Sequence, residues 1–142
     1  NVKKLRESEI SKGSKNTKTY DRFNKSCKKI KADFLKFLHF QLSKGKKFAA
    51  YGAAAKGNTF LNYCGLKKST INFIVDRNPK KIGLYSPGSH IPIVNEGYLV
   101  QEKPDYVIIL PWNLKEEIKN QLNYVKEWKA KFVCAVPKLE IF

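Results

Sequence analysis

Residues 46–59 form the stretch KKFAAYGAAAKGNT, and this stretch decides the fold. The apolar run after the two lysines leads straight into Gly52, as at the end of a buried strand. Residues 53–59 predict a turn and residues 60–64 a helix, which Gly65 ends. A strand, a turn of small residues and a helix in this order suit the first unit of an α/β sheet domain.

The rest of the chain alternates between strand and helix patterns. Near-continuous apolar runs predict buried strands at 71–76, 105–110 and 131–136, with a brief extended piece at 91–94. Apolar residues at helical spacing predict a helix over 114–128. Strands that are apolar along their length indicate a parallel sheet covered on both faces. We therefore expect a three-layer, Rossmann-like α/β domain with four main strands and a mainly parallel sheet.

A long amphipathic helix is expected before the first strand. Over residues 17–43, apolar side chains recur every three or four positions. Thr17 or Thr19 is a suitable N-cap. Residues 1–16 are polar, so we expect a flexible linker or tail there and a domain over 17–142. The apolar stripe of the helix packs either on this domain or on a preceding one.

The net charge of +16 is concentrated towards the N-terminus. Residues 1–47 hold 15 basic and 4 acidic residues, whereas residues 48–142 hold 13 and 8. A basic excess suits nucleic acid, anionic lipid or phosphorylated ligands. All but three of the 28 basic residues are lysines, however, and base recognition favours arginine. We therefore expect no dedicated role in binding nucleic acid.

Other features of the sequence exclude further classes of protein. No run of about 18 apolar residues predicts a transmembrane helix, and the polar N-terminus does not resemble a secretory signal. Cys27, Cys64 and Cys134 are single and distant from both histidines, so we expect no metal site. Unpaired cysteines suit a cytoplasmic protein. The absence of methionine favours a piece of a longer chain.

Ligands of a parallel sheet bind at the carboxyl ends of its strands. Segments 51–59, 76–78 and 111–113 are expected to meet there. The small residues of the first segment let a ligand approach the backbone, and a helix N-terminus with Lys56 suits an anion. The same small residues are equally explained by close packing of a helix on a strand, because their spacing departs from GxGxxG.

Individual residues at this edge have two interpretations each. Asp76 is expected either to accept hydrogen bonds from the hydroxyl groups of a ribose or to cap its own loop. Trp112 stacks on a base and Asn113 recognises its edge, or else Trp112 covers the sheet and Asn113 caps the next helix. His90 is a weak catalytic candidate, because no carboxylate or nucleophile accompanies it. Without a complete catalytic set, the residues indicate a binding domain.

Several blocks of the sequence resemble one known family. The blocks are 51–59, 61–65, 75–81 with Gly83, 87–93, 104–106, 110–113 and 136–137. In this order they look like the motifs of the C-terminal domain of sugar C-methyltransferases. The resemblance covers residues 20–140.

This resemblance implies a larger enzyme. Family members carry a zinc-binding region and an S-adenosylmethionine-binding domain before this one, and they methylate a carbon of a nucleotide-linked keto sugar, often a dTDP-deoxysugar. The C-terminal domain helps to hold the nucleotide sugar. The substrate-binding positions it implies are Tyr51, Lys56, Asn58, Asp76, Arg77, Trp112 and Asn113.

The sequence departs from the family pattern by omission. It contains neither the zinc cysteines nor the glycine motif of the methyltransferase domain. We therefore expect no catalysis by this chain alone, with S-adenosylmethionine bound mainly by a preceding domain of the same polypeptide. The main alternative is a stand-alone Rossmann-type sensor of nucleotides or coenzyme A. A basic nucleic-acid-binding protein that uses residues 1–47 is a less favoured alternative, because arginine is scarce.

Overall fold

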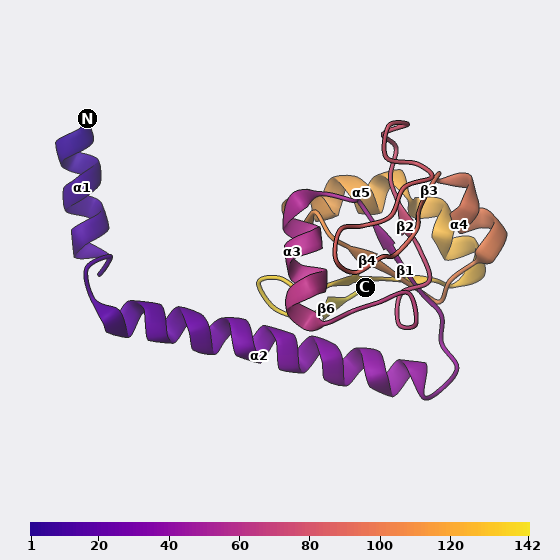
Figure 1. Cartoon of the computed structure of the whole chain (residues 1–142), viewed down its shortest axis with the longest axis horizontal. Helices are drawn as coiled ribbons and strands as arrows, with labels where there is room; N and C mark the ends of the chain where they lie inside the picture. Colours follow the sequence, from indigo (N-terminus) through magenta and orange to yellow (C-terminus); the bar gives the residue numbers. More distant parts are fainter.

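A six-stranded sheet lies at the centre of the computed structural model, which describes residues 1–142 (Figure 1). The strands are β1 (Phe48–Tyr51), β2 (Ile74–Val75), β3 (Ile93–Val94), β4 (Tyr106–Ile109), β5 (Lys131–Cys134) and β6 (Glu140–Ile141). Their order across the sheet is β3-β2-β1-β4-β5-β6. Strands β1 to β5 pair in parallel and β6 runs antiparallel to β5, which confirms the mainly parallel sheet.

Helices cover both faces of this sheet. The chain forms the helices α1 (Val2–Ser11), α2 (Thr17–Leu42), α3 (Ala55–Cys64), α4 (Gly97–Glu102) and α5 (Lys115–Gln121), with the 3-10 helices η1 (Trp112–Leu114) and η2 (Asn123–Trp128). All but α1 lie at the sheet. On one face, α2 and α3 share a core with Phe48 and Ile108. On the other, α4, α5 and η2 share a core with Val75 and Val107. The predicted three-layer, Rossmann-like arrangement is confirmed.

Strand β1 is the central element, and all four of its residues are buried. It pairs with β2 on one side and with β4 on the other. The helix after β1 packs on one face, whereas the helix after β4 packs on the opposite face. The two connections therefore diverge between the carboxyl ends of β1 and β4, which is where open α/β sheets form a ligand crevice.

Only the C-terminal half of α2 packs on the domain. Phe34 and Leu38 are fully buried there, whereas Tyr20 and Phe23 remain 60% and 69% exposed. Figure 1 shows the first turns of α2 extending beyond the sheet. The predicted helix is present, but its N-cap is Asn16, whose side chain accepts from the backbone N–H of Lys18, and neither threonine caps it. Long as it is, α2 lacks the sustained apolar character that a membrane-crossing helix needs, as do the other helices.

Residues 1–16 differ from the expected flexible tail. Residues 2–11 form α1, and no side chain of α1 is buried. In Figure 1, α1 stands apart from the rest of the molecule at the far end of α2. The structure thus places residues 2–11 in a helix that has no buried side chain, where the sequence predicts a linker or tail.

Three predicted elements have different bounds in the structure. The helix after β1 begins at Ala55, inside the predicted turn, so that Ala55 and Gly57 are helical whereas Gly52 to Ala54 form the turn. The strand predicted over 71–76 keeps only two ladder residues. The helix predicted over 114–128 is interrupted at Leu122, whose φ of −96° and ψ of 23° leave helical geometry. This break separates α5 from η2 while Ile118, Leu122 and Val125 all stay buried on the sheet.

The turn between β1 and α3 depends on two glycines. Gly52 has a φ of +89°, and a side chain added there would overlap the ring of Pro111. A Cβ added to Gly57 would lie 2.7 Å from the Cβ of Leu110. Both glycines therefore let the start of α3 sit directly against the segment that follows β4.

Replacing Gly52 with alanine tests this close approach. We expect Gly52→Ala to lower the free energy of unfolding by about 3 kcal/mol, because a positive φ and an overlap with a rigid ring both oppose the side chain. Gly83→Ala is the matched control, since Gly83 has a φ of +86° but no atom within 4 Å of an added Cβ. That variant should lose only about 1 kcal/mol in urea denaturation. Equal losses in the two variants would contradict the close approach to Pro111.

Candidate functional site

The three segments expected to form a site do meet at the carboxyl edge of the sheet. Asp76, after β2, accepts from the backbone N–H of Ala53 at 2.8 Å. Lys56 of α3 donates to Oδ1 of Asn113, which follows β4. The turn after β1 is therefore tied to its neighbours on both sides, and the crevice lies between α3 and η1.

The Asp76 carboxylate organises loops. Besides Ala53, its oxygens accept from the backbone N–H of Asn78 at 2.8 Å and from Lys81 Nζ at 3.3 Å. Lys81 Nζ also donates to the carbonyl oxygen of Ala53 at 2.9 Å. With its side chain only 12% exposed, Asp76 spends its acceptor capacity on the protein. This geometry favours the loop-capping interpretation over direct contact with ribose hydroxyls.

Lys56 spans the crevice. Its ammonium group donates to Asn113 and lies 5.0 Å from the centre of the Trp112 ring. An ammonium over an indole face is stabilised by the ring quadrupole. No side chain caps η1 or α5, so Asn113 is not the helix cap proposed as its alternative role. The entrance of the crevice is thus formed by a cluster of three side chains in contact, those of Lys56, Trp112 and Asn113.

The first turn of α3 adds unpaired backbone donors to this group. Its N-cap, Ala54, offers no side-chain acceptor, and the backbone N–H groups of Ala55, Lys56 and Gly57 have no partner in the chain. A helix N-terminus carries a partial positive charge and binds anions readily. In the next position, Asn58 has a buried Oδ1 atom with no hydrogen-bond partner. The edge therefore presents donors and positive charge together.

Tyr51 and Arg77 belong to a different network, on the opposite face of the sheet from α3. Tyr51 Oη accepts from Gln121 Nε2 of α5. Arg77 Nε donates to Glu96 at 2.7 Å, and Tyr124 Oη donates to the same carboxylate at 3.0 Å. The bond to Tyr51 fastens α5 to the end of β1, and the bonds to Glu96 join the start of α4 to η2 and to the segment after β2. Sequence patterns did not indicate Glu96, Gln121 or Tyr124, since polar residues on exposed helix faces give no signal of their partners.

Burial controls the ionisation of both tyrosines in this network. Burial raises the pKa of Tyr51, and the hydrogen bond from Gln121 offsets part of the increase. Burial likewise raises the pKa of Tyr124, and there the hydrogen bond to Glu96 adds to the effect. Both phenols are therefore neutral at physiological pH and act as hydrogen-bonding groups.

His90 lies outside these clusters. It is exposed on the loop before β3, with a φ of +54°, and only its backbone N–H is bonded, to Ser86. None of the hydrogen bonds or ion pairs of the site involves its side chain. No group of three His, Cys, Asp or Glu side chains is arranged to hold a metal ion.

An apolar groove of about 740 Å³ opens beside Lys56 and Trp112. Its walls come from α2, α3 and the chain after β5: Phe23, Ser26, Cys27, Ile30, Lys56, Thr59, Phe60, Tyr63, Trp112, Val136 and Pro137. The sequence signals its two walls separately, as the stripe of α2 and the apolar residues of α3. Only the tertiary structure shows that they face one another.

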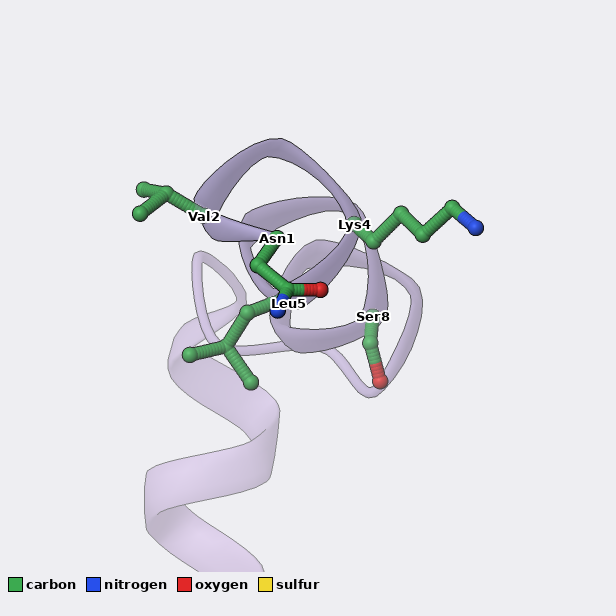
Figure 2. Close-up of a pocket in the computed structure, with 5 residues that line it drawn as sticks. All are labelled: Asn1, Val2, Lys4, Leu5 and Ser8. Atoms are coloured by element: carbon green, nitrogen blue, oxygen red, sulfur yellow. The ribbon is translucent and has the colours of Figure 1, made fainter.

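A second hollow lies on the first turns of α1 and is not a comparable site. Its five lining residues are Asn1, Val2, Lys4, Leu5 and Ser8. Figure 2 shows them spread around a single helix with their side chains directed outward and no facing element. A ligand there would be contacted from one side only, unlike ligands in concave sites.

Comparison with known proteins agrees with the resemblance in the sequence. Residues 1–137 match the family described as the C-methyltransferase C-terminal domain. The chain is also 31% identical over 119 residues to the C-methyltransferase NovU of Streptomyces niveus. That alignment covers 84% of this chain but only 28% of the relative, so the chain spans less than a third of the length of the curated protein it matches.

The tyrosine network predicts a stability change at alkaline pH. Because both folded-state pKa values are raised, the stabilisation is complete below about pH 10, the usual pKa of tyrosine, and is lost as the pH rises through the folded-state values. We expect the free energy of unfolding to fall less steeply above pH 10 in Tyr124→Phe than in the unchanged chain. Tyr85→Phe, at an exposed position, should keep the original profile. Identical profiles in all three proteins would show that Tyr124 ionises as freely as in the unfolded chain.

Proposed function

Because the chain belongs to the family of C-methyltransferase C-terminal domains, we propose that it is the nucleotide-sugar-binding domain of an S-adenosylmethionine-dependent enzyme that methylates a carbon of a keto-deoxysugar. The nucleotide sugar, dTDP-linked in the first instance, is held at the crevice between α3 and η1. The chain corresponds to 28% of its relative, so the reaction itself is assigned to a longer, cytoplasmic polypeptide.

The observation that carries this proposal is the unpaired positive edge of the crevice. Three backbone N–H groups at the start of α3 lack partners, and the Lys56 ammonium lies at the same end of the helix. The Asp76 carboxylate at the same edge already accepts from Ala53, Asn78 and Lys81. A diphosphate satisfies such an arrangement, because it supplies negative charge and several acceptors at once.

The predicted site residues take two kinds of role in this proposal. Lys56 and Asn113 bind phosphate or sugar oxygens once their mutual hydrogen bond opens, and Asn58 offers its buried acceptor to the ligand. Asp76 is a positioning residue that shapes the turn after β1. Tyr51 and Arg77 position α4 and α5 rather than touch the substrate. His90, which has no side-chain partner, has no part in proton transfer.

The residues of this crevice do not fit S-adenosylmethionine. An adenosyl group in a Rossmann fold places its ribose diol on the acid after β2, and here that acid is Asp76, whose acceptors are already used. The space beside Gly52 is occupied by Pro111, and the space beside Gly57 is occupied by Leu110. No ligand atom can approach the backbone there. We therefore assign the methyl donor to a preceding domain and expect no methyl transfer by this chain alone.

A general nucleotide sensor is the second candidate function. The strand order β3-β2-β1-β4-β5-β6 is that of dinucleotide-binding sheets, which favours nucleotide ligands of several kinds. Binding of coenzyme A or a dinucleotide in preference to any nucleotide sugar would identify this function. Steeply salt-dependent binding of DNA or RNA, lost on deletion of residues 1–47, would instead identify a nucleic-acid-binding protein.

Calorimetric titration with dTDP-, UDP- and GDP-linked sugars tests the proposed ligand. We expect Lys56→Ala to weaken binding about tenfold, because a charge-assisted hydrogen bond to phosphate is lost. Lys68→Ala is the control, since Lys68 is exposed and its ammonium group takes part in none of the ion pairs of the chain. Failure of all three classes of nucleotide sugar to bind, or equal affinities of the two variants, would contradict a phosphate site at α3.

Thermal unfolding separates the substrate from the methyl donor. A nucleotide sugar at about 100 times its Kd should stabilise the chain by about 2.7 kcal/mol, whereas S-adenosylmethionine should leave the melting temperature unchanged. A comparable stabilisation by S-adenosylmethionine would show that this chain holds the methyl donor. The assignment of that cofactor to a preceding domain would then be wrong.

A further inference from the structure

The groove between α2 and α3 has a consistent chemical character along its length. Lys56, Thr59, Phe60 and Tyr63 lie on one face of α3, at positions separated by three or four residues. The facing wall is the stripe of α2 that includes Phe23, Cys27 and Ile30. Four aromatic rings therefore line the groove, and none of its residues is acidic.

One end of the groove coincides with the proposed phosphate site. Lys56 and Trp112 line the groove, and they are the same residues that meet across the crevice at the start of α3. From Lys56 the groove follows α3 to Tyr63, a distance of about 10 Å along a helix axis at its usual rise per residue. A ligand bound by its phosphates at the end of α3 would thus extend its remaining atoms between the two helices.

We propose that this groove binds the aromatic base of the nucleoside diphosphate whose phosphates meet the N-terminus of α3. The inference rests on the proposed function and adds to it the place and the chemistry of base recognition. The base stacks on the aromatic side chains, of which Trp112 is nearest to the phosphates. Stacking of this kind does not depend on which base is bound, since every base has a π-face.

Hydroxyl groups in the walls suit the polar edge of a base. Ser26 Oγ donates to the carbonyl oxygen of Arg22, and Thr59 Oγ1 donates to that of Ala55. With each hydrogen already used, the oxygen lone pairs remain free to accept. An imide or amino N–H at the edge of a nucleobase supplies the matching donor.

A protein segment is a poorer occupant of the groove than a nucleotide. An apolar ridge of another domain would place uncharged atoms against the Lys56 ammonium, whose partners Asn113 and Trp112 are both neutral, and covering a charge without a counter-ion is costly. A nucleotide instead brings the phosphate that Lys56 lacks, joined to a ring that fits the aromatic walls. The combination of one cation with an apolar slot therefore favours a nucleotide.

The groove contains a built-in chemical probe. Cys27 lines the groove and is partly exposed, whereas Cys64 and Cys134 are buried. We would measure the rate at which N-ethylmaleimide alkylates Cys27 in the 142-residue chain, with and without dTDP, UDP, CDP, GDP and ADP. Inorganic pyrophosphate serves as the ligand that carries phosphates without a base. A parallel calorimetric titration establishes whether each ligand binds at all.

We expect at least one nucleoside diphosphate to protect Cys27. At about ten times its Kd, the ligand should slow alkylation about tenfold, because only the free protein reacts. Pyrophosphate should not protect the thiol. Phe23→Ala and Tyr63→Ala should weaken nucleotide binding about fivefold or more, through the lost stacking. Their controls are Phe40→Ala and Tyr85→Ala, which remove exposed aromatic side chains outside the groove.

The outcomes separate this inference from the proposed function. If a nucleoside diphosphate binds by calorimetry but leaves the Cys27 rate unchanged, the base lies elsewhere and this inference alone is overturned. Protection that persists equally in Phe23→Ala and Tyr63→Ala, each compared with its own ligand-free rate, also overturns it. Absence of calorimetric binding for all five nucleoside diphosphates and for nucleotide sugars contradicts both proposals together.

Discussion

The contact between Gly52 and Pro111 is the constraint on which the rest of this structure depends. It joins the end of β1 to the end of β4, the two strands between which the chain connections diverge to opposite faces. Because Gly52 has no side chain, α3 begins directly against the segment after β4, and Gly57 continues that approach against Leu110. A bulkier turn would move α3 away from η1. Lys56 of α3 would then lose its contacts with Trp112 and Asn113 of η1.

Small residues and charged residues therefore act together at this edge. The glycines are used for packing, which is one of the two interpretations of the sequence. The proposed anion site rests on what this packing leaves unpaired: the first turn of α3 and Lys56. Asp76 holds the turn in place with two backbone donors and Lys81. Contacts within the protein thus hold the proposed site in place before any ligand binds, and such preorganisation lowers the entropy cost of binding.

The two halves of α2 have different surroundings. Phe34 and Leu38 anchor α2 to the sheet, and the same apolar stripe then continues past the domain as one wall of the groove. The whole of α2 belongs to the family match, which covers residues 1–137. In α2, the periodicity that buries one end of the helix also lines the groove at the other.

Periodicity along the chain was enough to predict the layers, the parallel strands and the long helix, because burial on both faces of a sheet leaves a continuous apolar signal. It also placed Lys56, Asp76 and Asn113 at one edge, because parallel strands end together. What each side chain does there required the folded chain. The Asp76 oxygens are satisfied by Ala53 and Lys81, and Tyr51 points to Gln121, which lies 70 residues away in sequence. Hydrogen-bond partners and facing walls are set by contacts between distant segments, and such contacts leave no local pattern in the sequence.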